Sequence, residues 1–536
     1  MEVTIREEGA AFAASSVAGR LLDDGVPQRL AAGDPALWGE EATAEAAARL
    51  GWLTLPLTSR ELLPEIGKLV EWARAQGLTN VVLAGMGGSS LAAEVICDTY
   101  DVPLTVLDTT DAHQVRRALA EGLDTTVLVV ASKSGATVET DSHLRIFEAA
   151  FRAAGIDPGD RIVAVTDPDS PLEQAAIDAG YQLVLARPDV GGRYSALSAF
   201  GLVPSALAGV EIEKLLEQAG EVAPLLALPE GNPGLELGAV LGGAALNGRD
   251  KLILEDQLSE INGLPDWIEQ LVAESLGKDG RGVLPVVGAD PNGVSDELVV
   301  GIGSDNGDVR VDGRLGAQFL VWEYATAVAG RLLEVNPFDQ PDVAGAKRNT
   351  AALLEAPAPA QSPAFTDGPV EVYGQTSARD LPGLLNELLN AVPGDGYLAV
   401  LAYLDRLAAF DAPVREGADF EEMTDAWMAA DAATLRALLA LRTDRPVTFG
   451  WGPRYLHSTG QYHKGGPDNG VFLQITGVVT DDVPVPGRPF TLGALQHAQA
   501  LGDLEALAGL GRPAVRLHLT DRVTGVAHLL AAAQEA

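Results

Sequence analysis

A cluster of small hydroxyl residues around one lysine follows an apolar run in the stretch VLVVASKSGATVET, residues 127–140. Ser132, Ser134 and Thr137 each carry a hydroxyl group, and Lys133 adds a positive charge. The apolar run predicts a buried parallel strand and a helix follows it, so these groups are expected at the carboxyl end of a sheet. Hydroxyls, backbone amides and a lysine placed there can bind one phosphate group. Taken alone, the loop fits an ordinary helix cap with a solvated lysine equally well.

A second loop of this kind lies upstream, in VVLAGMGGSSLAAEV, residues 81–95. Gly87 and Gly88 allow the backbone to approach a ligand closely, and Ser89 lies near the start of the next predicted helix, where anions are favoured. No third glycine completes a dinucleotide-binding pattern. A tight strand-to-helix turn explains either loop alone, but two such loops at consecutive sheet edges favour a phosphate-bearing ligand.

Arg193 follows two glycines, the second of them Gly192, in DVGGRYSALSAFGL. An arginine at a turn of close backbone approach can place a planar, delocalised charge against a developing oxyanion. An exposed surface turn is the alternative reading of this stretch.

The stretch LPDWIEQLVAESLGKDGRG predicts a helix over residues 265–277. Gln270 and Glu274 are four residues apart and therefore share one face of it. A carboxylate near the end of a helix can reach into a cleft and act as a general base. By pattern alone, a solvated pair fits these two residues better.

The stretch EVNPFDQPDVAGAKRNT contains Gln340 and Lys347. Proline favours the start of a helix, and Lys347 is expected about two turns into it. A lone lysine on a helix is normally solvated. This stretch therefore indicates a functional site only in combination with the other stretches described above.

Repeated strand-and-helix segments must position these groups. Continuous apolar runs alternate with amphipathic segments, which predicts an α/β fold with parallel sheets covered on both faces. The predicted strands lie in NVVLAGM, PLTVLDT, TVLVVASK, RIVAVTD and YQLVLAR, then in RDKLILED, RGVLPVVGAD and DELVVGIGSD, and finally in YLAVLAYL, RPVTFGWG, GVFLQITG and AVRLHLTD.

The chain of 536 residues is too long for one hydrophobic core. We predict an N-terminal helical segment (1–55), two doubly wound domains (56–205 and 206–356) and a C-terminal α/β domain (357–536). The segment EAPAPAQSPAFTDGP, residues 355–369, is rich in proline and alanine and is predicted to be a linker.

The charge is strongly acidic, with 37 basic and 75 acidic residues and a net charge of −38. Such a surface repels nucleic acid and anionic membranes, so neither is expected as a partner. Cys97 is the single cysteine, which excludes an intrachain disulfide and a cysteine-based metal site. With no signal peptide or membrane span in the sequence, a cytoplasmic protein is predicted.

Taken together, five stretches resemble the phosphoglucose isomerase (glucose-6-phosphate isomerase) family, in the family's order. They are GMGGSSLA, SKSGATVET, GGRYSALSAFGL, QLVAESLGK and FDQPDVAGAK. The C-terminal stretch GWGPRYLHSTGQYHKGGPDNGVFLQITG is similar to the isomerase half of transaldolase–isomerase fusion proteins. The resemblance implies two sugar-isomerase (SIS-type) domains that convert glucose 6-phosphate to fructose 6-phosphate reversibly, in glycolysis and gluconeogenesis, without a metal or other cofactor.

The resemblance also implies the role of each site residue. Glu274 is the implied base that moves a proton between C2 and C1 through a cis-enediolate, Arg193 and the Gly192 backbone stabilise that intermediate, and Lys347 assists ring opening. The residues implied to bind the sugar phosphate are Gly88, Ser89, Ser132, Lys133, Ser134, Thr137, Gln270 and Gln340.

Two departures from the family concern the site. The stretch after the base reads SLGK instead of SNGK, and no histidine lies between Glu274 and Lys347, where the family has its ring-opening histidine. Either Lys347 and water open the ring, or a histidine from the C-terminal unit does so. For the second case we predict that the segment YLHSTGQYHKGG folds over the cleft and supplies His457 or His463. An ordinary strand-to-helix connection is the alternative for this segment.

Other functions stay open at this point. A dual isomerase that also accepts mannose 6-phosphate belongs to the same class, whereas a non-catalytic sugar-phosphate regulator has no need of Glu274, Arg193 and Lys347 together. Glutamine-dependent amination of a ketose phosphate would usually require an N-terminal cysteine, and Cys97 is internal. Family members are commonly dimers, so a homodimer is a candidate assembly, although the C-terminal unit could replace that contact.

Overall fold

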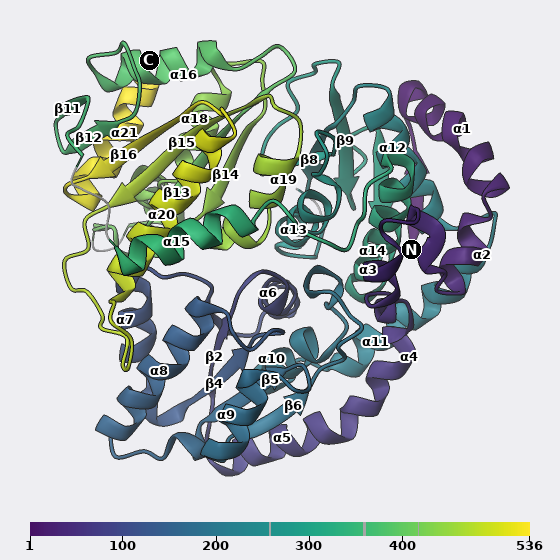
Figure 1. The fold of residues 1–536 in the computed structure, drawn as a ribbon, viewed down its shortest axis with the longest axis horizontal. Coiled ribbons are helices and arrows are strands. Elements are labelled where there is room, and N and C mark those ends of the chain that lie inside the picture. Colours follow the sequence, from purple (N-terminus) through teal and green to yellow (C-terminus); the bar gives the residue numbers. More distant parts are fainter. Residues whose placement is uncertain (257–258, 357–360, 416–417) are drawn as a thin grey trace.

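The computed structural model describes residues 1–256, 259–356, 361–415 and 418–536. Three sheets with helices on their faces make up the molecule. In Figure 1 the first sheet lies in the blue region at the bottom, the second in the teal region, and the third in the green and yellow region at the upper left. The predicted α/β class is confirmed.

The first sheet is entirely parallel, in the order β3-β2-β4-β5-β6. Its strands are β2 (Asn80–Gly85), β3 (Thr105–Leu107), β4 (Thr126–Ala131), β5 (Ile162–Thr166) and β6 (Gln182–Leu185). The helices around it are α5 (Leu63–Ala75), α6 (Leu91–Thr99), α7 (Ala112–Ala120), α8 (Val138–Ala153), α9 (Pro171–Ala179) and α10 (Ala199–Ala208). Every residue of β4 is buried, as its continuous apolar run predicts. Because β2 and β4 are neighbours, the loops that follow them meet at one edge of the sheet.

The second sheet has the order β1-β10-β9-β7-β8. Its strands are β7 (Lys251–Glu255), β8 (Leu284–Val287), β9 (Glu297–Ile302), β10 (Val309–Asp312) and β1 (Glu2–Ile5). Its helices are α11 (Ile212–Val222), α12 (Pro233–Leu246), α13 (Leu264–Leu276) and α14 (Leu315–Leu333). The next helix, α15 (Ala344–Glu355), packs against the C-terminal region instead. Strands β7 to β10 are parallel to their neighbours, and β1 joins the edge antiparallel to β10.

Strand β1 is an exception to the prediction that residues 1–55 form a helical segment. The helices α1 (Glu8–Asp23), α2 (Val26–Ala31), α3 (Thr43–Ala47) and α4 (Leu55–Thr58) do follow it. The strand itself pairs Val3 with Val311 and Ile5 with Val309. Four residues are too few for a strand pattern to stand out in the sequence, and the partner strand lies about 300 residues away, so tertiary pairing decides the structure here.

The third sheet has the order β11-β12-β16-β15-β13-β14, and its last four strands are parallel. The strands are β11 (Phe365–Asp367), β12 (Val370–Tyr373), β13 (Tyr397–Tyr403), β14 (Val447–Trp451), β15 (Gly470–Gly477) and β16 (Ala514–Leu519). Its helices are α16 (Leu381–Ala391), α17 (Phe420–Ala430), α18 (Thr434–Ala440), α19 (Gly460–Gly465), α20 (Leu492–Gly509) and α21 (Arg522–Glu535).

The predicted linker of residues 355–369 is wrong in its last part. Strand β11 lies inside it and forms a hairpin with β12, with Gly368 in the left-handed region (φ 54°) at the turn. Proline and alanine dominate the middle of the stretch and mask this short strand, while its residues 357–360 lie outside the described residues.

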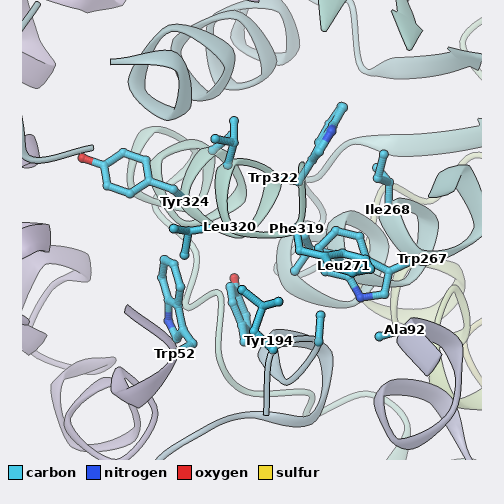
Figure 2. Close-up of a cluster of buried hydrophobic side chains, with 14 of the residues drawn as sticks. Trp52, Ala92, Tyr194, Trp267, Ile268, Leu271, Phe319, Leu320, Trp322 and Tyr324 are labelled. Atoms are coloured by element: carbon cyan, nitrogen blue, oxygen red, sulfur yellow. The ribbon is translucent and has the colours of Figure 1, made fainter. Parts of the chain in front are cut away.

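One continuous hydrophobic core joins the first two sheets and includes large aromatic residues from distant parts of the chain (Figure 2). Trp267 of α13 packs edge-on against Phe319 of α14, with ring centroids 4.8 Å apart. Trp52 packs against Tyr194 at 5.2 Å. Since Tyr194 follows Arg193 directly, this buried contact holds the arginine-bearing turn in place.

The third sheet has a core of its own and a second apolar contact with the rest of the molecule. Tyr397, Tyr462 and Phe472 pack with Ile253 of β7 and Ala273 of α13. Helix α15 runs alongside α20 of the C-terminal region, as Figure 1 shows. Among the described residues, none of the helices is both long and apolar enough to cross a bilayer.

Candidate active site

A cavity of about 410 Å³ lies where the first sheet, helix α13 and the C-terminal region meet. Its walls come mostly from six stretches of sequence that were singled out for their chemistry. The predicted site residues that line it are Gly88, Ser89, Lys133, Ser134, Thr137, Gly192, Arg193, Gln270, Glu274, Gln340, Lys347 and His457. Residues far apart in the chain therefore share one solvent-accessible space.

The hydroxyl loop of residues 132–137 forms one wall. Ser132 is buried behind the cavity lining, and its hydroxyl bonds that of Thr137 at 3.0 Å. Gly135 is in the left-handed region (φ 65°), which turns the chain into α8. No side chain caps the first backbone N–H groups of this 16-residue helix. The N-terminus of α8 and the hydroxyls thus form a site suited to a phosphate.

Lys133 forms an ion pair with Asp167 at the rim of this wall. Burial lowers the pKa of Lys133, although Asp167 opposes that shift. The opposite charges of Lys133 and Asp167 cancel each other. The hydroxyls and backbone amides therefore provide most of the attraction for an anion at this wall.

The glycine loop after β2 packs directly on the turn that carries Arg193. A Cβ atom at Gly88 would lie 2.1 Å from the carbonyl oxygen of Gly192, so only glycine fits. The Ser195 hydroxyl donates to the Gly88 carbonyl at 3.1 Å and links the two turns. The close approach predicted for these glycines is therefore between two backbones, and it brings Ser89 and Gly192 to the same cavity.

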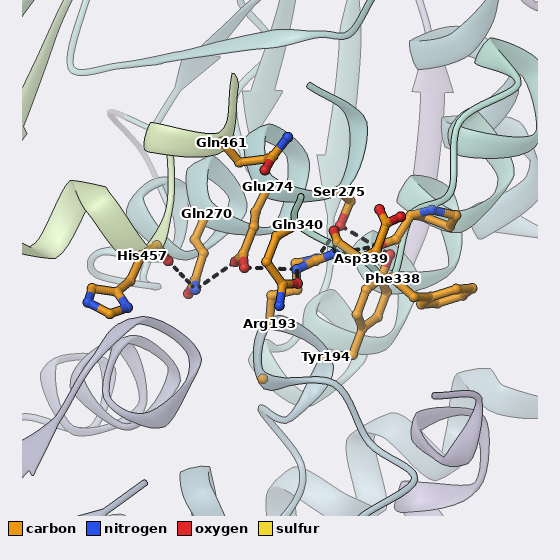
Figure 3. Close-up of polar contacts among 12 residues, drawn as sticks. Arg193, Tyr194, Gln270, Glu274, Ser275, Phe338, Asp339, Gln340, His457 and Gln461 are labelled. Atoms are coloured by element: carbon orange, nitrogen blue, oxygen red, sulfur yellow. Dashed lines mark hydrogen bonds and ion pairs between the residues drawn. The ribbon is translucent and has the colours of Figure 1, made fainter. Parts of the chain in front are cut away.

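Glu274 and Arg193 form an ion pair in the opposite wall (Figure 3). Arg193 Nη1 lies 2.8 Å from Glu274 Oε1, and Glu274 Oε2 accepts a bond from Gln270 Nε2 at 3.1 Å. Helix α13 supplies both Gln270 and Glu274 on one face, as their spacing predicts. A carboxylate held by two donors keeps a fixed orientation towards the cavity.

Arg193 itself is 4% exposed and is held by several acceptors. It donates to Ser275 Oγ at 2.9 Å and to Gln340 Oε1 at 3.0 Å. It also donates to the carbonyl oxygens of Pro337 (2.9 Å) and Asp339 (2.7 Å). The guanidinium thus ties the 337–340 segment to α13 and presents its charge beside Glu274.

His457 enters the cavity from the C-terminal region, on the 3₁₀ helix η10 (Arg454–His457). Its Nε2 lies 3.1 Å from Glu139 Oε1, in the first turn of α8. Gln499 Nε2 also donates to Glu139 Oε1, at 2.7 Å. Burial raises the pKa of Glu139, but the His457 ring, a backbone hydrogen bond and the charge of Lys347 together outweigh burial and lower that pKa. The result is a carboxylate–imidazole pair facing the cavity.

His463 does not line the cavity. It is 2% exposed, stacks on Tyr397 and shares a 2.9 Å hydrogen bond between its Nδ1 and the Tyr397 hydroxyl. Burial lowers the pKa of His463 well below its usual value. Of the two candidate histidines, only His457 lines the cavity, because α19 buries His463 against Tyr397 and Phe472.

Several cavity residues were not predicted from the sequence, namely Arg49, Met86, Asp167, Phe338 and Ser458, together with Glu139 behind His457. Glu139 follows the hydroxyl loop directly, and this position was the one available signal. Its partner lies 318 positions away, so the pair is invisible until the chain is folded.

The segment that carries His457 is anchored by buried ion pairs. Arg454 pairs with Glu94 of α6 and with Asp108, and Arg406 Nη1 lies 2.7 Å from Glu94 Oε1. Burial raises the pKa of Glu94, but the two guanidinium groups outweigh it and lower that pKa to about 2. Glu94 therefore links the first sheet to the C-terminal region through charge.

Replacing Glu94 with glutamine is expected to destabilise the protein by about 3 kcal/mol at pH 7, because two buried guanidinium groups lose their partner. The native pKa of Glu94 lies below its unfolded value of about 4.5, so its contribution is present above pH 4.5 and is lost as the pH falls towards 2. The midpoint of thermal unfolding, measured across this range, should differ between wild type and Glu94→Gln at pH 7 and converge in acid. The exposed Glu65→Gln is the control, and a difference that stays constant with pH would contradict this account.

Among the described residues, no group of three or more histidine, cysteine, aspartate or glutamate side chains is arranged to hold a metal ion.

Several proteins with similar sequences carry the name of the same enzyme. The family pattern described as phosphoglucose isomerase matches residues 66–279. A glucose-6-phosphate isomerase from Rubrobacter xylanophilus is 30% identical over 393 residues, which are 57% of this chain and 89% of that protein. A probable glucose-6-phosphate isomerase from Haloquadratum walsbyi is 34% identical over 215 residues, and one from Haloarcula marismortui is 37% identical over 216. The matched regions cover 39% and 38% of this chain, and the chain spans about half the length of these two relatives, 50% and 48%.

Among solved structures, that of a glucose-6-phosphate isomerase from Chlamydia trachomatis is similar over 59% of this chain and 75% of that chain. The TM-score is 0.48 and the sequence identity 19%.

Proposed function

The chain belongs to the phosphoglucose isomerase family, and we propose that it interconverts glucose 6-phosphate and fructose 6-phosphate without a metal ion. The observation that carries this proposal is one cavity lined by both the Glu274 carboxylate and the hydroxyl loop of residues 132–137. An aldose–ketose isomerase needs this pair of features, a base that moves a proton and a site that anchors the substrate at its other end.

Proton transfer is assigned to Glu274. Its carboxylate accepts the proton from C2 of the open-chain aldose, and the electrons of that C–H bond form the C1–C2 double bond of an enediolate. The same carboxyl group then returns the proton to C1, while a second proton passes from O2 to O1, which gives the ketose. Arg193 lies 2.8 Å from Glu274 and is positioned to stabilise the enediolate oxygen, together with the Gly192 backbone.

Substrate anchoring is assigned to the hydroxyl loop and the N-terminus of α8. Ser134, Thr137 and the uncapped N–H groups of α8 bind the phosphate oxygens, with Ser89 beside them. Ser132 acts indirectly, since its hydroxyl orients that of Thr137. Gln270 and Gln340 flank the Glu274–Arg193 pair and bind the sugar hydroxyls.

Ring opening is assigned to His457, with Glu139 orienting its imidazole and Lys347 on the facing wall. A histidine held by a carboxylate can move the proton between the ring oxygen and the C1 hydroxyl. We make no such assignment for His463, which is buried away from the cavity.

Replacing His457 with asparagine is expected to lower kcat by about 10²-fold, the low end of what a positioned acid–base group contributes. Ring opening then limits the rate, so the kinetic isotope effect measured with glucose 6-phosphate deuterated at C2 should fall towards unity. A merely structural role for His457 would leave the isotope effect as in the wild type. His528→Asn, at a histidine paired with Asp367 outside the cavity, is the matched control.

The test of the function is a coupled assay that follows conversion of fructose 6-phosphate in the presence of EDTA. We expect turnover that survives chelation. Binding of fructose 6-phosphate without turnover would overturn the enzyme and favour a regulatory sugar-phosphate binder. Conversion of mannose 6-phosphate in the same assay would extend the proposal to a dual isomerase.

Other parts of this proposal rest on the family alone. They are a role in glycolysis and gluconeogenesis, a cytoplasmic location, dimerisation and the similarity of residues 450–477 to transaldolase–isomerase fusion proteins. The C-terminal region of the same chain contributes Leu456, His457 and Ser458 to the cavity, which supports catalysis within a single chain.

A further inference from the structure

A second cavity, of about 470 Å³, lies between helices α15 and α20 and the strands β12 and β16. Among the described residues, none lines both this cavity and the candidate active site. Apolar side chains make up much of its wall, including Leu353 and Leu354 of α15, Phe490, and Leu501 of α20. Its volume falls within the range of about 300–1,000 Å³ found for sites that bind small molecules.

Arg516 of β16 gives this cavity a positive charge. The side chain lines the cavity and is only 5% exposed. The Arg516 guanidinium lies over the Tyr373 ring, 4.0 Å from the ring centroid, and Nη1 is 3.4 Å from Thr476 Oγ1. Within the described residues, no carboxylate lies within ion-pair distance of Arg516, and its buried Nε has no hydrogen-bond partner. A buried guanidinium with so few partners is costly unless an anion completes its hydrogen bonds.

The charged groups around Arg516 favour a ligand that carries one negative charge. Glu371 also lines the cavity, but it accepts a hydrogen bond from the Tyr373 hydroxyl at 2.7 Å rather than pairing with the arginine. Burial and the neighbouring Arg516 lower the pKa of His518, which disfavours a second positive charge on its ring. A dianion would face one fixed cation and a nearby carboxylate, which favours a ligand with a single charge.

We propose that this cavity binds a small organic monocarboxylate with an apolar body. The carboxylate pairs with the fork of the Arg516 guanidinium, whose planar donors match its two oxygens. The apolar body packs against Leu353, Phe490 and Leu501.

Phenylacetate is the probe for this proposal, with phenylacetamide as its neutral analogue and phenyl phosphate as its dianionic one. Calorimetric titration of the full chain at pH 8, where histidines are neutral, should give at least about tenfold tighter binding of phenylacetate than of either analogue. Arg516→Gln should weaken phenylacetate binding by at least about tenfold and bring it to the level of the amide. Thermal unfolding and isomerase activity, unchanged in this variant, serve as its folding controls.

Leu501→Trp provides a second variant, which keeps Arg516 and fills the cavity. We expect Leu501→Trp to abolish phenylacetate binding. This variant tests the proposal by itself if Arg516→Gln does not fold. No measurable binding to the wild type at millimolar phenylacetate would overturn the proposal. So would equal binding to wild type and both variants, or phenyl phosphate that binds as tightly as phenylacetate.

Discussion

Replacing Glu274 with glutamine should lower kcat for fructose 6-phosphate by about 10³–10⁴-fold, with KM changed by only a few-fold. Glutamine has the shape of glutamate but cannot accept the proton that leaves the substrate carbon. The bond that Gln270 donates to Glu274 Oε2 and the fold of α13 can persist in the variant, so the substrate still binds. Steady-state rates in both directions of the reaction measure this effect.

The matched control is Glu269→Gln, the same chemical change one residue before Gln270 on the same helix. Burial raises the pKa of Glu269 well above its usual value, and this side chain lies outside the cavity lining. We expect its kcat to stay within about twofold of the wild type, since this side chain does not reach the cavity in which the reaction takes place. Equal rates in the Glu274 and Glu269 variants would contradict the assignment of Glu274 as the base.

Arg193→Lys is expected to lower kcat by about 10²–10³-fold, the usual cost of losing one donor to a developing oxyanion. Arg193 contacts Glu274, Ser275 and Gln340 at once and also two backbone carbonyls. A lysine keeps the charge but places its donors on one nitrogen, so it cannot span these partners. The enediolate then loses stabilisation, and the Gln340 segment loses its tie to α13.

Two measurements separate this effect from structural damage. Proton transfer should become fully rate-limiting in Arg193→Lys, so its C2 deuterium isotope effect should be at least as large as that of the wild type. Arg187→Lys is the control, because Arg187 pairs with Asp189 on the connection before the active-site turn and does not line the cavity. A loss confined to KM in Arg193→Lys would contradict the role in stabilising the intermediate.

The strands and the local geometry of the loops could be predicted from the sequence because both depend on short-range chemistry. The β-branched run before Ser132 can be buried only in a sheet, and the four-residue spacing of Gln270 and Glu274 places them on one helix face wherever that helix lies. The short strands β1, β10, β11 and β12 escaped prediction, since each is defined by pairing with another strand rather than by its own pattern.

The sequence by itself thus determined which residue types stand at the ends of which strands and helices, because hydrophobic periodicity and turn chemistry act over a few residues. Only the tertiary structure decided that His457, and not His463 in the same segment, faces the cavity and meets Glu139. It likewise decided that Arg516 remains without a carboxylate partner among the described residues. Such contacts join positions hundreds of residues apart, and they are set by how whole sheets and helices pack, which no local pattern records.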